Sequence, residues 1–177
     1  MKNKDYQAML HKYIPGGAHT YSKGDDQFPE NAPPVLAKGE GCYVWDAEGR
    51  KYLDYGMGIY SVVLGYGYKR VSDAIAEGAR LGSNFTRASV IEAEFAKEFV
   101  DLIPSAEMVK FAKNGSTATT AAVKLARAFT GRDLIAICGS HPFFSYDDWF
   151  IGSTIMDAGI PRAVKELTVK FYYNNIE

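Results

Sequence analysis

The stretch from Met108 to Gly139 constrains the fold more than any other part of the chain. Val109 and Phe111 alternate with polar neighbours, as residues of a short strand do. In the segment that follows, apolar side chains recur at helical spacing: Ala118, Ala121, Ala122, Leu125, Ala126 and Phe129. Gly131 ends this helix, and 134–138 is an apolar run of strand length. The order strand, helix, strand predicts an α/β fold in which the two strands pair in parallel and the helix buries one face.

The turn between the first strand and the helix carries the chemistry of this stretch. Residues 114–117, Asn-Gly-Ser-Thr, place a permissive glycine and two hydroxyls where the first helical N–H groups have no internal partner. Since the helix dipole is also positive there, a phosphate group fits the turn. The same residue types are common as plain N-caps, so the local sequence leaves both interpretations open. Neither a nucleoside-triphosphate loop nor a dinucleotide fingerprint is indicated, because both glycine patterns are absent.

This stretch resembles the cofactor-phosphate segment of the class III (fold-type I) pyridoxal-phosphate aminotransferases, most closely the branch containing glutamate-1-semialdehyde aminomutase. That family typically carries Ser-Gly-Thr-Glu-Ala, then a helix ending Leu-Ala-Arg, then Thr-Gly-Arg-Asp. The matching positions here are Asn114-Gly115-Ser116-Thr117-Ala118, Leu125-Ala126-Arg127 and Thr130-Gly131-Arg132-Asp133. Two of them depart from the pattern, with Asn114 where Ser is usual and Thr117 where Glu is usual. The resemblance implies that Asn114, Gly115, Ser116 and Thr117 hold the phosphate of pyridoxal 5'-phosphate (PLP).

The resemblance also implies the fold. We expect a fold-type I PLP-transferase, with residues 1–68 forming an N-terminal segment and a small-domain β-meander. Residues 69–177 would begin the large parallel-sheet PLP-binding α/β domain. The sequence itself predicts three short meander strands, at 35–38, 42–46 and 51–54. Because the family continues well beyond residue 177, we expect this chain to be the N-terminal portion of a longer enzyme.

A glycine- and tyrosine-rich loop at 55–68 is the first candidate for substrate contact. Such a backbone suits close approach to a ligand, although a packed, turn-rich loop has the same composition. The family places substrate-facing residues here, which implies roles for Ile59 and Tyr60. Ile59 stands where the aminomutase has a tryptophan, and this argues against that exact substrate. Arg87, at the end of a polar loop, either recognises an anionic substrate or is simply solvated.

The ring-stacking residue of the cofactor site is less clear. In the family, an aromatic residue in a Tyr-His-Gly motif after the second strand stacks on the pyridine ring. An ungapped alignment puts Pro142 at that position. The resemblance therefore leaves two candidates, His141 and Phe143.

The family's activity requires more than this chain offers. None of its lysines has the sequence context of the family's Schiff-base lysine, so we expect that catalytic residue beyond residue 177. The leading hypothesis is the N-terminal part of a PLP-dependent aminotransferase, or of an enzyme with aminomutase-like chemistry. It would act on a small-molecule amine or keto substrate as a homodimer with shared active sites. One alternative is a non-catalytic remnant that keeps the dimer surface or the phosphate-binding turn at 114–117, which we call the phosphate cup. Another is a phosphate-sugar-binding domain unrelated to PLP.

Charge and composition exclude other classes. The 20 basic and 21 acidic residues are interspersed and give a net charge of −1, which is not typical of nucleic-acid or anionic-membrane binding. No apolar run approaches the roughly 20 residues of a membrane span. Cys42 and Cys138 are far apart and outside any metal-binding pattern, so we expect no metal and a reducing, cytoplasmic location.

Overall fold

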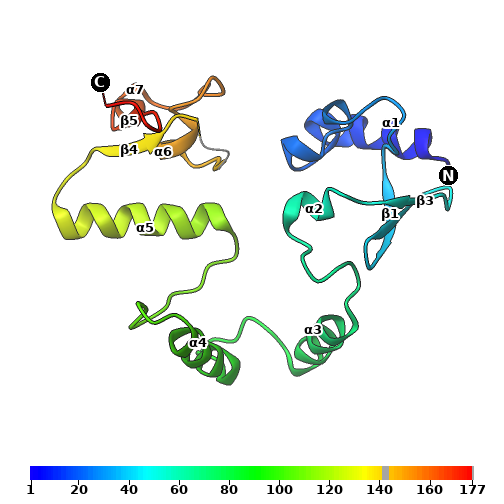
Figure 1. Cartoon of the computed structure of the whole chain (residues 1–177), viewed down its shortest axis with the longest axis horizontal. Helices are drawn as coiled ribbons and strands as arrows, with labels where there is room; N and C mark the ends of the chain where they lie inside the picture. The colour runs from blue at the N-terminus through cyan, green and yellow to red at the C-terminus, as the bar shows by residue number, and fades with distance from the viewer. Residues whose placement is uncertain (141–143, 177) are drawn as a thin grey trace. The chain divides into compact units, whose positions relative to one another are not determined.

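The computed structural model describes residues 1–140 and 144–176, which contain helices and short strands. The chain divides into two compact units, Met1–Arg87 and Ala88–Glu177. Figure 1 labels most of their helices and strands. The first contains α1 (Asn3–Tyr13), 3-10 turns (Pro15–Gly17, Tyr21–Lys23 and Asp25–Gln27), β1 (Leu36–Glu40), β2 (Tyr43–Asp46), β3 (Lys51–Leu53), α2 (Met57–Tyr60) and α3 (Lys69–Leu81). The second contains α4 (Val90–Leu102), α5 (Gly115–Thr130), β4 (Ile135–Cys138), α6 (Asp148–Ile151), α7 (Arg162–Lys165) and β5 (Thr168–Phe171).

The first unit is built on an antiparallel sheet with strand order β1-β2-β3, which confirms the three predicted meander strands. Gly49, in the turn between β2 and β3, has a φ of +81°, a region that glycine enters without strain. Lys38, Trp45 and Lys51 are cross-strand partners in one row. Both ammonium groups approach the Trp45 ring, at 4.6 and 5.4 Å from a ring centroid. These cation–π contacts tie the three strands together on one face.

The other face of β2 carries a buried carboxylate that joins the sheet to α1. The Asp46 side chain is 0% exposed, and it accepts hydrogen bonds from Asn3 Nδ2 and Tyr52 OH, each at 2.9 Å. Arg50 adds an ion pair through Nε at 2.9 Å, and the backbone N–H groups of Glu48 and Arg50 donate to the second oxygen. Burial alone would raise the pKa of Asp46, but these hydrogen bonds outweigh it and hold the pKa well below its ordinary range.

Helices α4 and α5 of the second unit have well-defined termini. Ser89 Oγ accepts from the Glu92 N–H, and the Glu92 carboxylate accepts from the Ser89 N–H, which completes a capping box at the start of α4. Gly131 ends α5 in the left-handed conformation, with φ +65°. The predicted strand at 134–138 is confirmed as β4.

One predicted strand is wrong. Residues 108–112 form no strand, because none of the strands in the described residues pairs with them. β4 pairs in parallel with β5 instead, with Ile135 opposite Thr168. Phe111 has a different use, since its ring stacks on that of Phe95 in α4 at a centroid distance of 5.1 Å.

The apolar stripe of α5 has the predicted spacing but not the predicted burial. Leu125 is 71% exposed and Phe129 is 90% exposed, because no other described element covers them. Among the described residues, the buried apolar side chains are Val44 and Phe150. These units thus supply little of the tertiary burial that usually stabilises an amphipathic helix. Within residues 1–140 and 144–176, no helix is long and apolar enough to cross a membrane.

Candidate anion-binding site at the start of helix α5

Helix α5 begins with a single side-chain cap that leaves two backbone donors free. Asn114 is extended, with φ −154° and ψ 167°, and its Oδ1 accepts from the Thr117 N–H at 2.9 Å. The Ala118 N–H donates to the Asn114 carbonyl at 3.2 Å. Across the described part of the chain, the N–H groups of Gly115 and Ser116 have no hydrogen-bond partner. Two donors are therefore available at the positive end of a 16-residue helix.

The hydroxyls of the first turns divide into structural and free groups. Thr119 Oγ1 donates to the carbonyls of Gly115 and Ser116, each at 3.0 Å, so it is used within the helix. The hydroxyls of Ser116 and Thr117 form no hydrogen bond with any described residue. A methyl group added at Gly115 would meet nothing within 4 Å. Open space, two free amides and two free hydroxyls together match the acceptor oxygens of a phosphate.

One turn deeper, α5 is attached to the chain that follows β4. Thr120 Oγ1 donates to Asp147 Oδ2 at 2.5 Å and accepts from Trp149 Nε1 at 2.8 Å. The Asp147 N–H in turn donates to Ser145 Oγ, whose residue is fully buried. This network fixes the start of α5 against 145–149. The sequence gives no sign of it, because Thr120 and Asp147 are 27 positions apart and meet through the fold alone.

Removing the Asn114 cap has a defined consequence for stability. We expect Asn114→Ala to lower the free energy of unfolding by about 1 kcal/mol, because the Thr117 N–H loses its acceptor. Asn114→Ser should retain most of the stability, since serine is also a good N-cap and is the residue usual in the family. Urea unfolding followed by circular dichroism measures both. An Asn114→Ala variant as stable as the wild type would show that the cap does not stabilise the chain.

The other predicted site residues are partly described. Ile59 and Tyr60 lie in α2 of the first unit, and they are 44% and 76% exposed. Arg87 is exposed, and its side chain has no hydrogen bond or ion pair with any described residue. His141 and Phe143 lie outside the described residues.

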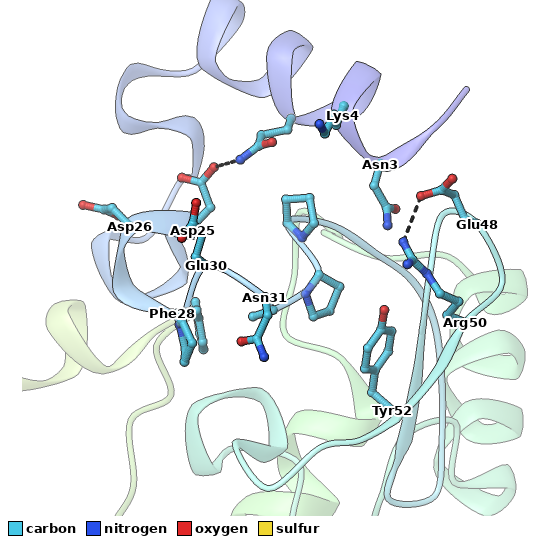
Figure 2. A pocket seen from close by; sticks show the side chains of 15 residues that line it. Asn3, Lys4, Asp25, Asp26, Phe28, Glu30, Asn31, Glu48, Arg50 and Tyr52 are labelled. Atoms are coloured by element: carbon cyan, nitrogen blue, oxygen red, sulfur yellow. Dashed lines mark hydrogen bonds and ion pairs between the residues drawn. The ribbon is translucent and has the colours of Figure 1, made fainter.

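A separate hollow in the first unit includes none of these residues. It has a volume of about 470 Å³ and lies between α1, the segment 25–34 and the meander (Figure 2). Among its charged side chains, Arg50 pairs with Glu48, and Asp25 contacts Gln7 and His11. The side chains of Lys4, Asp26 and Glu30 form no hydrogen bond or ion pair with any described residue. Hydrogen bonds from Gln7 and then His11 keep the pKa of Asp25 below its ordinary range.

The comparisons with known proteins identify the family of the chain. The class III aminotransferase family matches residues 26–155. The glutamate-1-semialdehyde 2,1-aminomutase of Sulfurihydrogenibium sp. (strain YO3AOP1) is 31% identical, over 99% of this chain and 43% of its own length. The protein of the same name from Aquifex aeolicus (strain VF5) is 32% identical, over 100% of this chain and 43% of its own length. The chain thus spans about two fifths of the length of these relatives.

Solved structures confirm the predicted fold class. The FumI protein of Sphingopyxis sp. MTA144, in its PLP internal aldimine form, superposes with a TM-score of 0.87 at 30% identity. It is matched over 98% of this chain and 41% of its own. An omega-transaminase from Sphaerobacter thermophilus gives a TM-score of 0.82 at 25% identity, over 98% of this chain and 42% of its own. The described elements are therefore those of a fold-type I PLP-transferase, incomplete relative to these structures.

Proposed function

The chain belongs to the class III aminotransferase family, and we propose that it supplies the cofactor-phosphate part of a PLP-dependent aminotransferase or aminomutase-like enzyme. The observation that carries this proposal is the start of α5. Two backbone amides and two hydroxyls are free there, at the positions that match the family's phosphate segment. In this enzyme, residues 1–68 would belong to the small-domain side and residues 69–177 to the large PLP-binding domain.

The residues at this turn each have a distinct part in holding the cofactor. Gly115 lets a phosphate oxygen reach the backbone, because no side chain occupies the space beside it. The amides of Gly115 and Ser116 and the hydroxyls of Ser116 and Thr117 would hold the phosphate by donating hydrogen bonds to its oxygens. Asn114 keeps the turn open by capping Thr117. Once bound, PLP supplies an electron sink that makes the proton on the substrate's amine-bearing carbon easier to remove.

The chemistry also needs groups beyond the phosphate cup. The proposed catalytic lysine, which bonds to the cofactor, lies beyond residue 177. The aromatic partner of the pyridine ring is proposed to be His141 or Phe143. Ile59, Tyr60 and Arg87 are proposed to contact a small-molecule amine or keto substrate. We further propose that the enzyme is a cytoplasmic homodimer with active sites shared between subunits.

The relative affinities of PLP and pyridoxal test the proposal. Pyridoxal has the same ring but lacks the phosphate, so each charge-assisted hydrogen bond of the cup is lost with it. We expect the 177-residue chain to bind PLP at least roughly tenfold more tightly than pyridoxal in isothermal titration calorimetry. Equal affinities, or no binding of PLP, would overturn the phosphate-cup assignment.

A titration with inorganic phosphate separates the proposed function from the alternative of a phosphate-binding domain unrelated to PLP. Every hypothesis in which residues 114–117 bind phosphate predicts that inorganic phosphate competes with PLP. Tight binding of phosphate combined with failure of PLP to bind would favour a phosphate-binding module without PLP chemistry. The dimer is tested independently by sedimentation equilibrium, in which a monomer at all concentrations contradicts the shared-site proposal.

A further inference from the structure

The segment 55–65 is a loop that begins and ends at the meander. It starts directly after Asp54, at the end of β3, and Tyr66 at its far end forms an isolated antiparallel bridge with Gly41. The two backbone hydrogen bonds of this bridge measure 2.8 and 2.9 Å. A surface loop of this length with adjacent ends is an Ω-loop. We call these residues the 55–65 loop.

One carboxylate holds both ends of the 55–65 loop. Asp54 Oδ1 accepts from the Gly56 N–H at 2.9 Å, where the loop begins. Asp54 Oδ2 accepts from the Tyr66 hydroxyl at 2.6 Å, where the loop ends. The hydrogen bond to Asp54 raises the pKa of Tyr66 above its ordinary value. We call the Asp54–Tyr66 hydrogen bond the latch.

The two ends of the loop pack closely against β1 and Gly41. A Cβ at Gly39 would lie 2.5 Å from Cγ of Tyr66, so the tyrosine ring rests directly on the backbone of β1. A Cβ at Gly65 would lie 3.1 Å from the Gly41 backbone. These two glycines allow a contact that any larger residue would force apart. The ring of Tyr66 therefore has a fixed position against the sheet.

The far part of the loop is strained. Met57, Ile59 and Tyr60 have φ values of +41°, +58° and +60°, a region that side-chain-bearing residues, and β-branched ones above all, rarely adopt. Two backbone hydrogen bonds within the loop hold this conformation. The Tyr60 N–H donates to the Gly56 carbonyl at 2.9 Å, and the Val62 N–H donates to the Met57 carbonyl at 3.0 Å. Strain of this kind persists only where the surrounding structure fixes it, and it is concentrated at ligand-binding sites.

The strained part presents a surface without charge. Tyr55, Tyr60 and Val63 are 83%, 76% and 79% exposed, and no residue of the 55–65 loop carries a charged side chain. Aromatic and aliphatic groups on a rigid backbone lose little conformational entropy on binding. Such a surface complements an uncharged portion of a ligand.

We propose that Asp54 and Tyr66 are positioning residues, which hold the 55–65 loop closed so that Ile59 and Tyr60 present a preformed surface to the uncharged part of an amine substrate. The identity of the ligand rests on the proposed function, whereas the latch and the strain it maintains do not. Neither Asp54 nor Tyr66 need touch the substrate. Their effect is transmitted through the backbone between Gly56 and Gly65.

Hydrogen–deuterium exchange tests the latch without any cofactor. Tyr66→Phe removes the hydroxyl but keeps the ring on Gly39, and it should speed amide exchange at Tyr60 and Val62 at least roughly tenfold. The matched control is Tyr52→Phe, which removes a tyrosine–carboxylate hydrogen bond from the same unit but outside the loop. Unchanged exchange in Tyr66→Phe, or an equal rise in both variants, would overturn the latch.

Ligand binding tests the positioning role. With hexylamine as the probe, titration of the wild-type chain should shift the amide resonances of Ile59 and Tyr60 saturably, and Tyr66→Phe should need at least roughly tenfold more probe. Equal affinities, or no shift in the wild type, would overturn the positioning role while leaving the PLP result untouched. A failure of PLP to bind would overturn the proposed function and not the latch. If Tyr66→Phe does not fold, Asp54→Asn, which keeps a neutral acceptor, should show a smaller effect of the same sign.

Discussion

Replacing Asp46 by alanine is expected to lower the thermal unfolding midpoint of the chain by roughly 10 °C or more, because the change leaves buried donors without their acceptor. Asn3, which is 4% exposed, would lose one of its two hydrogen bonds to the meander. The side chains of Tyr52 and Arg50 would each lose a hydrogen bond to the same carboxylate. Circular dichroism on heating measures the effect. The matched control is Asp73→Ala, which removes an exposed ion pair with Lys69 and should change little.

The pH dependence of the same variant gives an independent check. Because the folded-state pKa of Asp46 lies below its unfolded value of about 4, the carboxylate stabilises the fold fully above that pH. The contribution is lost as the pH falls below about 4 toward the folded-state pKa. The difference in midpoint between wild type and Asp46→Ala should thus be large at neutral pH and shrink in acid. A difference that stays constant down to about pH 2 would contradict the assigned ionisation.

Gly115→Ala is expected to separate stability from cofactor binding. The new methyl group meets nothing within 4 Å of the protein, and alanine is the better helix former, so stability should rise by about 0.5–1 kcal/mol. The same methyl group occupies the space through which a phosphate oxygen would reach the backbone. We therefore expect the affinity for PLP to fall at least roughly tenfold, as measured by calorimetry.

A second glycine provides the control for Gly115→Ala. Gly78 lies inside α3, and a Cβ there also meets nothing within 4 Å. Gly78→Ala should give the same gain in helix stability and leave the affinity for PLP unchanged. If both variants bind PLP as the wild type does, the space beside Gly115 is not where the phosphate lies.

Elements whose signals are local could be predicted from the sequence. Ser89 and Glu92 form the capping box that their spacing predicts, and Gly131 ends α5 as a glycine at that position should. The meander could be predicted equally well, since its strands are separated by short turns that contain glycine. In each case the determining residues are neighbours along the chain, so one continuous segment contains the whole signal.

Features that depend on distant partners could not be predicted in this way. The alternation around Val109 and Phe111 fits a strand, but a strand exists only when another pairs with it, and β4 pairs with β5. The helical period of α5 predicts an apolar face and cannot say what covers it, as the exposure of Phe129 shows. The contact between Asp54 and Tyr66 likewise requires the loop to return to Gly41.

The resemblance to the family located the candidate phosphate cup, but the free donors are visible only in the structure. Sequence alone leaves residues 114–117 as either an anion site or a plain N-cap. The structure shows that Asn114 caps Thr117 while the amides of Gly115 and Ser116 stay unpaired within the described chain. Capping and anion binding are therefore compatible at this turn, because they use different N–H groups.

Amide chemical shifts test most directly where the cofactor phosphate binds. In a titration of the isotope-labelled 177-residue chain with PLP, the largest saturable shifts should be those of the Gly115 and Ser116 N–H groups. Inorganic phosphate should shift the same two resonances in the same direction, since both ligands present the same oxygens. Shifts confined to other residues, or identical shifts in wild type and Gly115→Ala at equal ligand concentration, would contradict the assignment of this turn as the cofactor-phosphate site.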